Sequence, residues 1–586
     1  MTSVQQVPEY PSPTIVDSRR LMGANLYSDR VGAVLEVRFD DASAHILLAG
    51  WAASVRAFAE ALSWSDVDLH TRREPGGASL FLSAPVDALM TATEINERSW
   101  VAAECAVPPG AEFLARLQVS AELEQLTRRG LAELVGAARA RGLGTMFDDE
   151  ALTLGSGAGS LSWPLGSLPN VNDVPWASLY DVPIALVTGS NGKTTTTRIV
   201  SAMWMAAGRV TGWCCSDGVW VGGDQLDAGD YSGPGGAREV LRDHRVQAAV
   251  LETARGGILR RGLAVSRADA AIITNISADH FGEYGIATER DLAEAKRVVA
   301  RVLGAQGTLV LNADDEQLTA LAGRMPHRIA WFSVSPEHVA LDEHVRQGGG
   351  AATVHEGRLM LHGNEVWHDL GSIHDMPITL GGGAPHNTQN VLGAALLAMA
   401  SGVPVTAIRA TLATFGASPR DNPGRLNVLR VGGITVIVDY AHNPEGLASL
   451  CETARTFPAN RRFLVLGQAG NRDDDQLRAL VRAAWHVLPF DEVVIKEMPR
   501  LFRGRAPGDV PRVFVQELAR LGLSAQSIHI AESEFTAVRQ AMSLALAGDL
   551  IVCPLHTEQA AVLSWFQVLI DAAWSARSPF PHTVPS

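Results

Sequence analysis

The sequence predicts an α/β protein in which a central and a C-terminal domain each contain a parallel sheet, preceded by an α+β N-terminal domain. From about residue 180 onward, short and nearly continuous apolar runs alternate with helical patterns. Such runs are typical of parallel strands that are buried on both faces. A polar break, "SPRDNPGR" at 418–425, separates two series of this kind. The first 150 residues mix strand-like and helix-like runs, and the 586 residues suffice for about three to four domains.

The expected elements follow in chain order. The N-terminal part has strand-like runs at 33–39, 45–50 and 78–85, a helix-like run at 51–64 and one or two helices within 112–142. The two later series have expected strands at 184–188, 246–252, 269–275 and 307–312, and then at 435–439, 463–467, 491–496 and 549–553. The segment 154–176 is rich in Gly, Ser and Pro, which is typical of a linker. The predicted division is a disordered lead (1–16), an N-terminal α+β domain (17–150), a linker (151–180), a central domain (181–418) and a C-terminal domain (419–586).

Composition limits the classes of partner. The formal net charge of −14 argues against a broad nucleic-acid surface, although it allows a local basic pocket for an anionic substrate. The five cysteines show no CxxC spacing and no disulfide pattern, so we expect a reducing cytoplasm. The N-terminal sequence lacks a signal-peptide pattern, and no stretch reaches about 18 uncharged apolar residues, so we expect no membrane span.

The stretch "LVTGSNGKTTTTRIV", residues 186–200, predicts a phosphate-binding turn between a strand and a helix. Gly189 and Gly192 allow a tight turn that brings backbone N–H groups and a helix N-terminus to a polyphosphate. Lys193 offers a cation to the terminal phosphates and Thr194 a hydroxyl to magnesium. Two residues, rather than the usual four, separate the glycine from Gly-Lys. The alternative is a glycine-rich turn with a surface lysine, which the strand–turn–helix order disfavours.

Further polar residues follow the next strands of this series. "AVLETARGG" places Glu252 at a strand end, where a carboxylate beside a phosphate turn can hold magnesium. "ITNISADHFGEYG" delivers Asn275, Asp279 and His280 in the same way. The helical run "RDLAEAKRVVA" carries Lys296. The alternatives are a loop histidine with a capping role for His280 and a solvated helix lysine for Lys296.

The short motif TGxNGKTTT, with TNIxxDH, HNxxN and DYAHNP further on, resembles the Mur ligase family of ATP-dependent ligases. The resemblance implies a P-loop central domain, a Rossmann-like C-terminal domain, and ATP and Mg²⁺ as cofactors. It implies that Lys193, Glu252, His280 and Lys296 act in catalysis, with a carbamylated Lys296 holding a second magnesium. The implied metal ligands are Thr194, Glu252, His280 and carbamylated Lys296. The implied ATP-binding residues are Gly189, Ser190, Asn191, Gly192, Lys193, Thr194, Thr195, Asn387, Asn390, Arg425 and Asp439. For the asparagines of HNxxN, helix capping is the alternative.

Within that family, residues 181 to about 555 most resemble the cyanophycin synthetases, through strings such as "ITNISADHFGEYGIATERDLAEAKRVV", "GQAGNRDDD" and "KEMPRLFRGRAPGDVP". Those enzymes carry an ATP-grasp domain between their N-terminal and Mur-like parts. Here about 30 residues separate the N-terminal part from the phosphate turn, too few for that domain. The resemblance therefore implies that only side-chain ligation is retained, without backbone polymerisation.

The expected reaction is the joining of a carboxylate to an amine through an acyl phosphate, with release of ADP. The expected partners are a small-molecule or peptide carboxylate, such as an aspartyl group, and an amino acid such as arginine as the amine. Arg255 and Arg260 are candidates for binding the carboxylate, although at least one of Arg255, Arg260 and Arg261 is expected to be a surface charge. His442, Asn443 and Asp474 are candidates for the amine side, with a solvated acidic turn as the alternative for Asp474.

Two other functions remain open at this stage. The substrates of the same chemistry could be a small amino acid or a γ-glutamyl-type acceptor. Alternatively, the chain could be a non-catalytic ATP-binding paralogue that associates with a full-length cyanophycin synthetase, although the retained Lys193, Glu252 and His280 favour a ligase. We expect a homo-oligomer, and we expect the adjacent Cys214 and Cys215 of "WCCSDG" to be buried small side chains rather than a metal or redox site.

Overall fold

The computed structural model describes residues 14–106, 110–278 and 281–581, and it divides into two compact units. Unit 1 comprises 1–355, 360–370 and 391–411, and so contains the N-terminal domain and most of the central domain. Unit 2 comprises 356–359, 371–390 and 412–586. The predicted boundary at 418/419 therefore differs from the observed division, because the segment 371–390 belongs with the C-terminal sheet. No helix among the described residues is long and apolar enough to cross a membrane.

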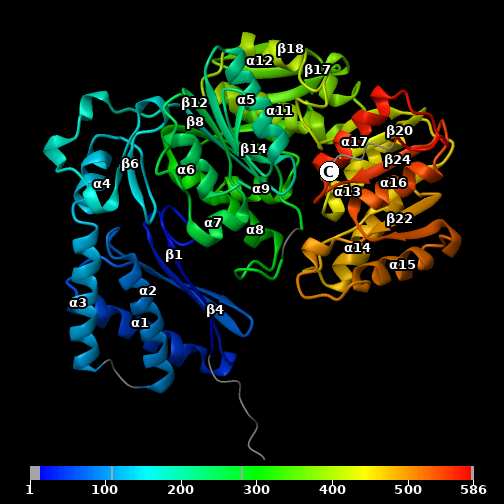
Figure 1. The fold of residues 1–586 in the computed structure, drawn as a ribbon. Coiled ribbons are helices and arrows are strands. Elements are labelled where there is room, and N and C mark those ends of the chain that lie inside the picture. Colours follow the sequence, from blue (N-terminus) through cyan, green and yellow to red (C-terminus); the bar gives the residue numbers. More distant parts are fainter. Residues whose placement is uncertain (1–13, 107–109, 279–280, 582–586) are drawn as a thin grey trace, which may run out of the picture. The chain divides into compact units, whose positions relative to one another are not determined.

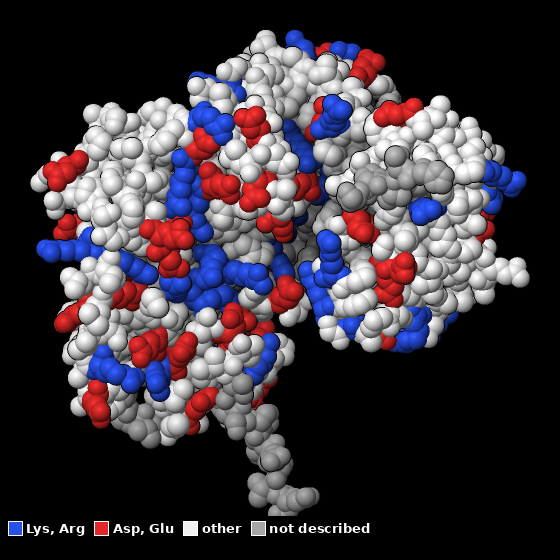
Figure 2. All heavy atoms as spheres, in the orientation of Figure 1, with Lys and Arg blue, Asp and Glu red and all other residues white. Residues whose placement is uncertain are grey.

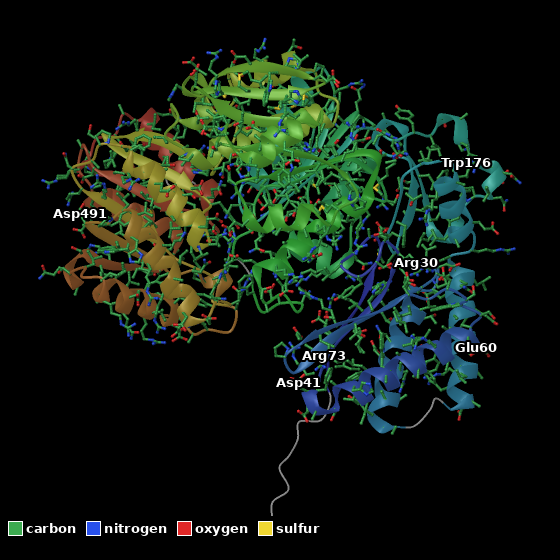
Figure 3. All side chains as sticks on the ribbon, turned by 180° about the vertical axis from the view of Figure 1, so that it is seen from behind. Arg30, Asp41, Glu60, Arg73, Trp176 and Asp491 are labelled. Carbon is green, nitrogen blue, oxygen red and sulfur yellow. The ribbon has the colours of Figure 1, made fainter. Side chains whose placement is uncertain are left out.

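The N-terminal domain is an antiparallel sheet of four strands, in the order β1-β2-β4-β3, packed against helices (Figure 1). The strand expected at 45–50 is wrong, because this run belongs to a helix whose buried residues Leu47, Trp51, Val55 and Phe58 recur at helical spacing. At the domain surface, Arg73 forms an exposed ion pair with Asp41 (Figure 3). The elements are β1 (Thr14–Leu21), β2 (Gly32–Arg38), α1 (Ala44–Ala61), β3 (Leu69–Glu74), β4 (Gly77–Ser83), α2 (Leu89–Cys105), α3 (Ala111–Thr127) and α4 (Leu131–Ala140).

The predicted linker at 151–180 is wrong as an unstructured connection. Strands β5 (Thr145–Phe147), β6 (Ala151–Leu154) and β7 (Leu161–Pro164) form a small antiparallel sheet. Ser156 Oγ accepts a hydrogen bond from the backbone N–H of Val182 at 2.9 Å, and Ala158 N donates to Val246 O at 2.8 Å. These bonds attach the segment to the central domain. The lead is also shorter than predicted, since β1 begins at Thr14.

The central domain contains an 11-stranded sheet in the order β11-β10-β9-β12-β8-β13-β14-β15-β16-β17-β18. Neighbouring strands from β9 to β16 are parallel. The inner strands β8 and β12 are buried along their whole length, which is why their sequences are nearly continuous apolar runs. The strands are β8 (Ile184–Thr188), β9 (Thr211–Cys215), β10 (Gly218–Val221), β11 (Asp224–Ala228), β12 (Ala248–Glu252), β13 (Ala268–Ile273), β14 (Leu303–Asn312), β15 (Arg328–Ser333), β16 (Ala351–His355), β17 (Arg358–Gly363) and β18 (Val366–Ser372). The helices are α5 (Lys193–Ala206), α6 (Pro234–Arg242), α7 (Arg255–Arg261), α8 (Glu289–Arg297), α9 (Glu316–Ala322), α10 (Val339–Arg346), α11 (Pro385–Ala400) and α12 (Val405–Leu412).

The sheet of unit 2 has six strands in the order β19-β20-β24-β21-β22-β23, with only the β19–β20 pair antiparallel. The four strands predicted in this region are present with ends within two residues of those observed. The strands are β19 (Asn427–Val431), β20 (Ile434–Asp439), β21 (Arg462–Leu466), β22 (Glu492–Lys496), β23 (Ile528–Ala531) and β24 (Leu550–Pro554). The helices are α13 (Pro444–Arg455), α14 (Asp474–Val487), α15 (Asp509–Arg520), α16 (Glu534–Leu544) and α17 (Gln559–Asp571).

Candidate phosphate and metal site and C-terminal substrate site

The phosphate turn connects β8 to α5. Gly189 has φ +149° and Gly192 has φ +82°, conformations that glycine adopts at little cost. A Cβ on Gly189 would lie 1.8 Å from the Thr274 Oγ1, so a side chain at this position would displace the end of β13. The turn thus requires glycine both for its backbone angles and for close packing against a neighbouring strand.

Asn275, just past β13, fixes the shape of this turn. Its side-chain Oδ1 accepts from Asn191 N at 2.8 Å, and its backbone carbonyl accepts from Ser190 N at 3.0 Å. Thr274 Oγ1 donates to Asn191 O at 2.6 Å. Because the N–H groups of Ser190 and Asn191 are used inside the fold, the element aimed at an anion is the start of α5, where the first N–H groups of a helix have no intrahelical partner.

Lys193 and Thr194 are the first two residues of α5. Lys193 is half-buried, and its Nζ donates to the carbonyl oxygen of Ser190 at 3.0 Å. The ammonium group therefore lies folded back over the turn, close to the start of α5. A lysine at this point of a phosphate turn can bind a terminal phosphate.

A carboxylate and two hydroxyls meet beside the helix start. Glu252, 2% exposed at the end of β12, accepts from Thr194 Oγ1 at 2.8 Å. Ser216 Oγ lies 3.1 Å from the same Thr194 hydroxyl. Strands β12, β8 and β13 are neighbours, so Glu252, the turn and Asn275 all lie at the carboxyl ends of adjacent parallel strands. Hard oxygen donors of this kind fit Mg²⁺, which commonly takes one or two protein ligands beside nucleotide phosphates and water.

Lys296 lies on α8 and is 3% exposed, so the alternative of a solvated helix lysine is wrong. Its Nζ donates to the carbonyl oxygen of Gly189 at 2.7 Å. His280 and Asp279 lie outside the described residues. Among the described residues, no group of three or more His, Cys, Asp and Glu side chains is arranged to hold a metal ion.

Two candidate carboxylate-binding arginines follow Glu252 on α7. Arg255 is buried, and its guanidinium pairs with Glu283 at 2.6 Å. Arg260 is exposed and donates from Nε to the Tyr284 hydroxyl at 2.7 Å. Basic side chains gather over the part of this unit where α7 and β1 lie (Figure 2). Arg260 and the exposed Arg261 are thus accessible to an anionic group, whereas Arg255 is committed to a carboxylate of the chain.

In unit 2, the carboxyl end of β20 carries Asp439 and the following loop. Asp439 Oδ2 accepts from Leu426 N at 2.7 Å, which ties it to the residue after Arg425. The guanidinium of Arg425 stacks over the Tyr440 ring, 4.2 Å from its centroid. The fold therefore brings Arg425 and Asp439, two of the predicted ATP-binding residues, to one place.

The remaining predicted residues of this unit form hydrogen bonds within the fold. Asn387 is 3% exposed and donates from Nδ2 to Ile378 O at 2.9 Å, while Asn390 Nδ2 donates to Asn387 Oδ1 at 3.1 Å. These bonds favour a structural role at the start of α11. Asn443 is the N-cap of α13 and accepts from Gly446 N at 2.8 Å. His442 is half-buried, with Nδ1 3.2 Å from Tyr440 O.

The expectation that Asp474 reads a cationic substrate is not supported by its contacts. Its carboxylate pairs with Arg505 at 2.8 Å and with Arg478 at 3.5 Å. Arg505 first of all holds the pKa of Asp474 below its usual range, through a direct hydrogen bond. Asp473 caps α14 with a capping box. The acidic turn thus binds arginines of its own chain, an interaction that sequence spacing did not reveal.

The adjacent cysteines are buried, as expected, in β9. Burial raises the pKa of the Cys215 thiol to about 12 and that of Cys214 well above its usual range. Such thiols behave as small apolar side chains. Ser216, which follows them directly, is the residue that the sequence analysis overlooked at this site.

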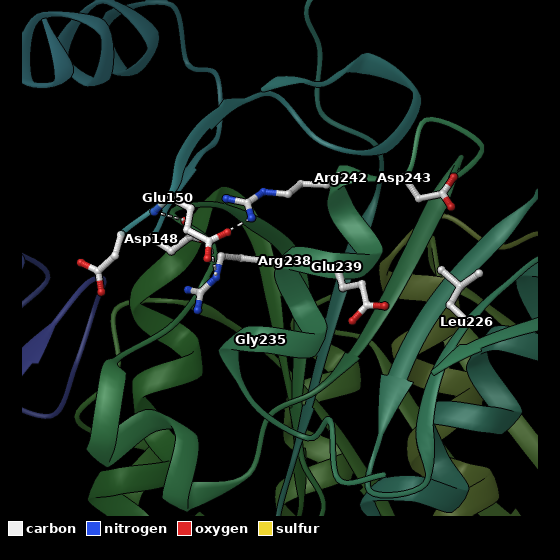
Figure 4. A pocket seen from close by; sticks show the side chains of 9 residues that line it. Asp148, Glu150, Leu226, Gly235, Arg238, Glu239, Arg242 and Asp243 are labelled. Atoms are coloured by element: carbon white, nitrogen blue, oxygen red, sulfur yellow. Dashed lines mark hydrogen bonds and ion pairs between the residues drawn. The ribbon is translucent and has the colours of Figure 1, made fainter. Parts of the chain in front are cut away.

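A separate cavity of about 660 Å³ lies in unit 1 (Figure 4). Its wall includes Asp148, which pairs with Arg242 at 2.8 Å and with Arg238 at 3.4 Å. Burial and the neighbouring Arg242 and Arg261 lower the pKa of Arg238 despite Asp148. None of the residues predicted from the sequence to form a site lines this cavity. Its lining consists of Asp148, Asp149, Glu150, Leu226, Gly235, Arg238, Glu239, Arg242 and Asp243.

The parallel sheet, the glycine turn and the Thr194–Glu252 contact define a P-loop protein of the α/β class. The sequence pattern of the Mur ligase middle domain matches residues 187–398, and that of the Mur ligase, glutamate ligase domain matches residues 424–553. Through these two domains the chain belongs to the Mur ligase family.

The relatives add a similarity to one group within that family. The chain is 36% identical over 371 residues to the cyanophycin synthetase of Trichormus variabilis (strain ATCC 29413 / PCC 7937) and 39% identical over 334 residues to that of Crocosphaera subtropica (strain ATCC 51142 / BH68). The matches cover 63% and 57% of this chain but only 41% and 38% of those relatives. The chain thus spans less than half the length of these curated relatives.

More distant similarities cover a comparable share of this chain. The UDP-N-acetylmuramoyl-L-alanyl-D-glutamate--2,6-diaminopimelate ligase of Chlorobaculum tepidum is 26% identical over 387 residues, covering 62% of this chain and 70% of that protein. The solved structure of E. coli FolC in complex with DHPP and ADP aligns with a TM-score of 0.47 at 19% identity, covering 67% of this chain and 89% of that chain.

Proposed function

We propose that this chain is an ATP-dependent, ADP-forming ligase that joins a carboxylate to an amine through an acyl phosphate. The observation that carries the proposal is the meeting of the phosphate turn, Thr194 and Glu252 at adjacent strand ends. The similarity to cyanophycin synthetases and to a diaminopimelate-adding ligase supports the reaction class.

The proposed chemistry follows from these residues. A substrate carboxylate oxygen attacks the γ-phosphorus of ATP, and the bond to the β,γ-bridging oxygen breaks, giving an acyl phosphate and ADP. The amine then attacks the acyl carbon, loses a proton, and expels inorganic phosphate. The N-terminus of α5 and Lys193 bind the β- and γ-phosphates and counter the charge that develops on them.

Mg²⁺ fits the oxygen donors at the helix start and, when bound, neutralises phosphate charge. Glu252 and Thr194 would hold it, and His280 is a further proposed ligand outside the described residues. Lys296 is buried beside the phosphate turn, and the proposed modification of its nitrogen is a carbamate. A carbamate there would add a second pair of oxygen donors for a metal.

The proposed substrates are an aspartyl or related peptide carboxylate and an amino acid such as arginine. Arg260 is the residue best placed to bind the carboxylate, because Arg255 is already paired. The Tyr440–Asn443 loop, rather than Asp474, is the proposed amine side. A γ-glutamyl-type acceptor or a small amino acid remains a variant of the same proposal.

The rival proposal is a non-catalytic ATP-binding partner of a full-length cyanophycin synthetase. It rests on the short segment of about 30 residues before the phosphate turn, which is too small for the ATP-grasp domain that the resemblance to cyanophycin synthetases implies. A ligase is favoured by the retained Lys193 and by the buried Glu252 in contact with Thr194, because a degenerate paralogue would be expected to have lost such residues.

The deciding experiment measures ADP release by the purified full chain with Mg²⁺ and bicarbonate. Aspartyl peptides and free amino acids are crossed with arginine, lysine and other amines, and products are weighed by mass spectrometry. Lys193→Ala should reduce turnover by roughly 100-fold, because one charge-stabilising donor is lost. Arg209→Ala, an exposed substitution beyond the end of α5, is the matched control. If the purified chain binds ATP but turns over no pair of carboxylate and amine, the result favours the rival proposal.

A further inference from the structure

Lysine is rare in this chain, and each lysine has a special position. Among 49 lysine and arginine residues, the lysines are Lys193, Lys296 and Lys496. The first two belong to the proposed phosphate and metal site. Lysine differs from arginine in its compact ammonium group with three donors. Lys496 is the one lysine that the proposed function has not yet used.

Lys496 is the last residue of β22 and is 1% exposed. The chain makes room for its stem, since a Cβ on Gly467 would lie only 2.3 Å from Lys496 Cγ. Gly467 follows β21, the neighbouring strand. The side chain therefore crosses the carboxyl edge of the sheet, where ligands bind in open α/β sheets.

Three acceptors surround the Lys496 ammonium group. Its Nζ donates to the carboxylate of Glu534, to Pro554 O at 2.5 Å, and to His556 Nδ1 at 3.2 Å. These acceptors match the three N–H bonds of an ammonium group. The buried charge is thus completely hydrogen-bonded, as a stable buried ion pair requires.

The contact with Lys496 determines the tautomer of His556. An ammonium group can only donate, so His556 Nδ1 must accept and carry no proton. The proton then lies on Nε2, which is 3.1 Å from the carbonyl oxygen of Ala441. Burial and the charge of Lys496 lower the pKa of His556 to about 3, which keeps the ring neutral.

Glu534 completes the cluster from the start of α16. Its carboxylate accepts from the backbone N–H groups of His556 at 2.8 Å, Thr557 at 3.0 Å and Glu558 at 2.7 Å. Burial alone raises the pKa of Glu534, but Lys496, His556 and the backbone donors outweigh it and lower the pKa to about 2. The carboxylate therefore holds both Lys496 and the backbone of His556 in place.

The cluster acts on the loop that the proposed function places at the amine side. His556 binds the Ala441 carbonyl and packs edge-on against the Tyr440 ring, at 5.2 Å between centroids. Tyr440 in turn packs against His442 and supports the Arg425 guanidinium. A change at Lys496 would thus reach the loop through one hydrogen bond and one ring contact.

We infer that Lys496 and His556 are positioning residues. Lys496 holds His556 in the Nε2–H tautomer, and His556 then donates to the Ala441 carbonyl. This bond orients the 440–443 loop for the incoming amine. The part of the inference that concerns the amine rests on the proposed function. The part that concerns the His556 tautomer, the structural half, does not. Lys496 and His556 themselves need not touch the substrate.

The structural half is tested by nitrogen NMR of the full chain carrying isotope-labelled histidine, with the His556 signals assigned from His556→Gln. In the parent chain, the expected result is a single Nε2–H tautomer of His556 that stays neutral to about pH 4. In Lys496→Met, we expect a mixture of His556 tautomers and a higher pKa of His556. If Lys496→Met does not fold, the double variant Lys496→Met/Glu534→Gln replaces it in the same measurement, because it leaves no unpaired buried charge. An Nδ1–H tautomer in the parent chain would overturn the inference whether or not the chain is a ligase.

The functional half compares two replacements of His556. His556→Gln can still accept from Lys496 and donate to Ala441, so the kcat/KM for the amine should stay within about threefold of the parent. His556→Phe keeps a ring but loses both bonds, so this kcat/KM should fall by roughly tenfold or more. His529→Gln, at a partly exposed histidine paired with Glu492, is the control.

The outcomes separate the two proposals. Equal amine kinetics in correctly folded His556→Phe and His556→Gln would overturn the positioning role. Absence of turnover in the parent chain counts against the ligase, and the tautomer measurement then decides the structural half alone.

Discussion

Lys296 Nζ donates a hydrogen bond to the carbonyl oxygen of Gly189, so the last turn of α8 is attached to the first residue of the phosphate turn. The bond lies in the interior, and Lys296 is 3% exposed. It joins the element that follows His280 in sequence to the element that is proposed to bind ATP. Any shift of α8 would therefore be transmitted to the phosphate turn.

We expect Lys296→Ala to reduce ligase turnover by roughly 100-fold or more, because both the bond to Gly189 and the proposed carbamate are lost. Lys296→Arg keeps a donor but cannot form a carbamate, and should be equally inactive. The carbamate itself is measured by NMR of the parent chain in isotope-labelled bicarbonate. Full activity of Lys296→Arg would contradict the carbamate and leave only the hydrogen bond.

Arg72 on β3 of the N-terminal domain supports the other end of α8. Its guanidinium binds Asp291 at 2.6 Å, and Asp291 completes the capping box with Thr288 at the start of the helix. Arg72→Ala should therefore reduce turnover by roughly tenfold through misplacement of α8. Steady-state ADP release is the measurement. The matched control is Arg73→Ala, which removes an exposed ion pair with Asp41 and should leave turnover unchanged. Equal effects of the two substitutions would exclude a role of the N-terminal domain in positioning α8.

Glu252 and Thr194 predict a specific dependence on magnesium. Glu252→Gln removes the carboxylate charge with little change in shape. We therefore expect turnover to fall by roughly 100-fold, and the Mg²⁺ concentration that gives half-maximal turnover to rise. Thr194→Ser keeps the hydroxyl and should retain most of the activity. The measurement is ADP release against Mg²⁺ concentration at saturating ATP. An unchanged Mg²⁺ dependence in Glu252→Gln would argue that the metal is held elsewhere.

The cysteines provide a test that does not depend on the proposed function. Cys105 is exposed, whereas Cys214, Cys215, Cys451 and Cys553 are buried. Burial raises the pKa of Cys215, Cys451 and Cys553 to about 12, so their thiolates are scarce near neutral pH. A thiol reagent should modify one of the five cysteines in the native chain and all five after unfolding. Rapid modification of a second native thiol would contradict the packing of β9.

The sequence predicted those parts of the fold and site that depend on local order. The strand, turn and helix around Gly189 are consecutive, and the buried parallel strands leave long apolar runs. Glu252 and Asn275 could be placed because parallel strands end at one edge of a sheet. The segment 151–180 could not, since its attachment depends on bonds such as that from Val182 N to Ser156 Oγ rather than on composition.

Two residues of the candidate site have partners within the chain that the sequence does not reveal. Asp474 looks available in sequence, but its partner Arg505 is supplied by a distant loop. Asn387 fits a nucleotide-binding motif, yet its amide bonds the backbone of Ile378. Lys496 escaped the prediction because a buried lysine at a strand end has no motif around it. The rarity of lysine in the composition was the available signal.

The His556 cluster makes the stability of the C-terminal sheet depend on pH. In the folded chain the pKa of His556 is lowered to about 3 by burial and by Lys496, whereas an unfolded histidine has a pKa of about 6.5. As pH falls below about 6.5, the unfolded state binds a proton that the folded state does not, so stability decreases until about pH 3. The loss approaches about 1.4 kcal/mol per pH unit for this one group.

Glu534 is charged at neutral pH, whereas His556 is neutral. Glu534 affects the stability at lower pH than His556 does. Its folded pKa of about 2 lies below the usual carboxyl value, so its contribution is present at neutral pH and is lost as pH falls below about 4.5 toward 2. Between about pH 6.5 and 4.5 the histidine therefore dominates. Hydrogen exchange of the β24 and α16 peptides should show protection falling between about pH 6.5 and pH 4.5 in the parent chain. The fall should be smaller in His556→Gln and unchanged in His529→Gln. An equal fall in His556→Gln would mean that another group controls this window.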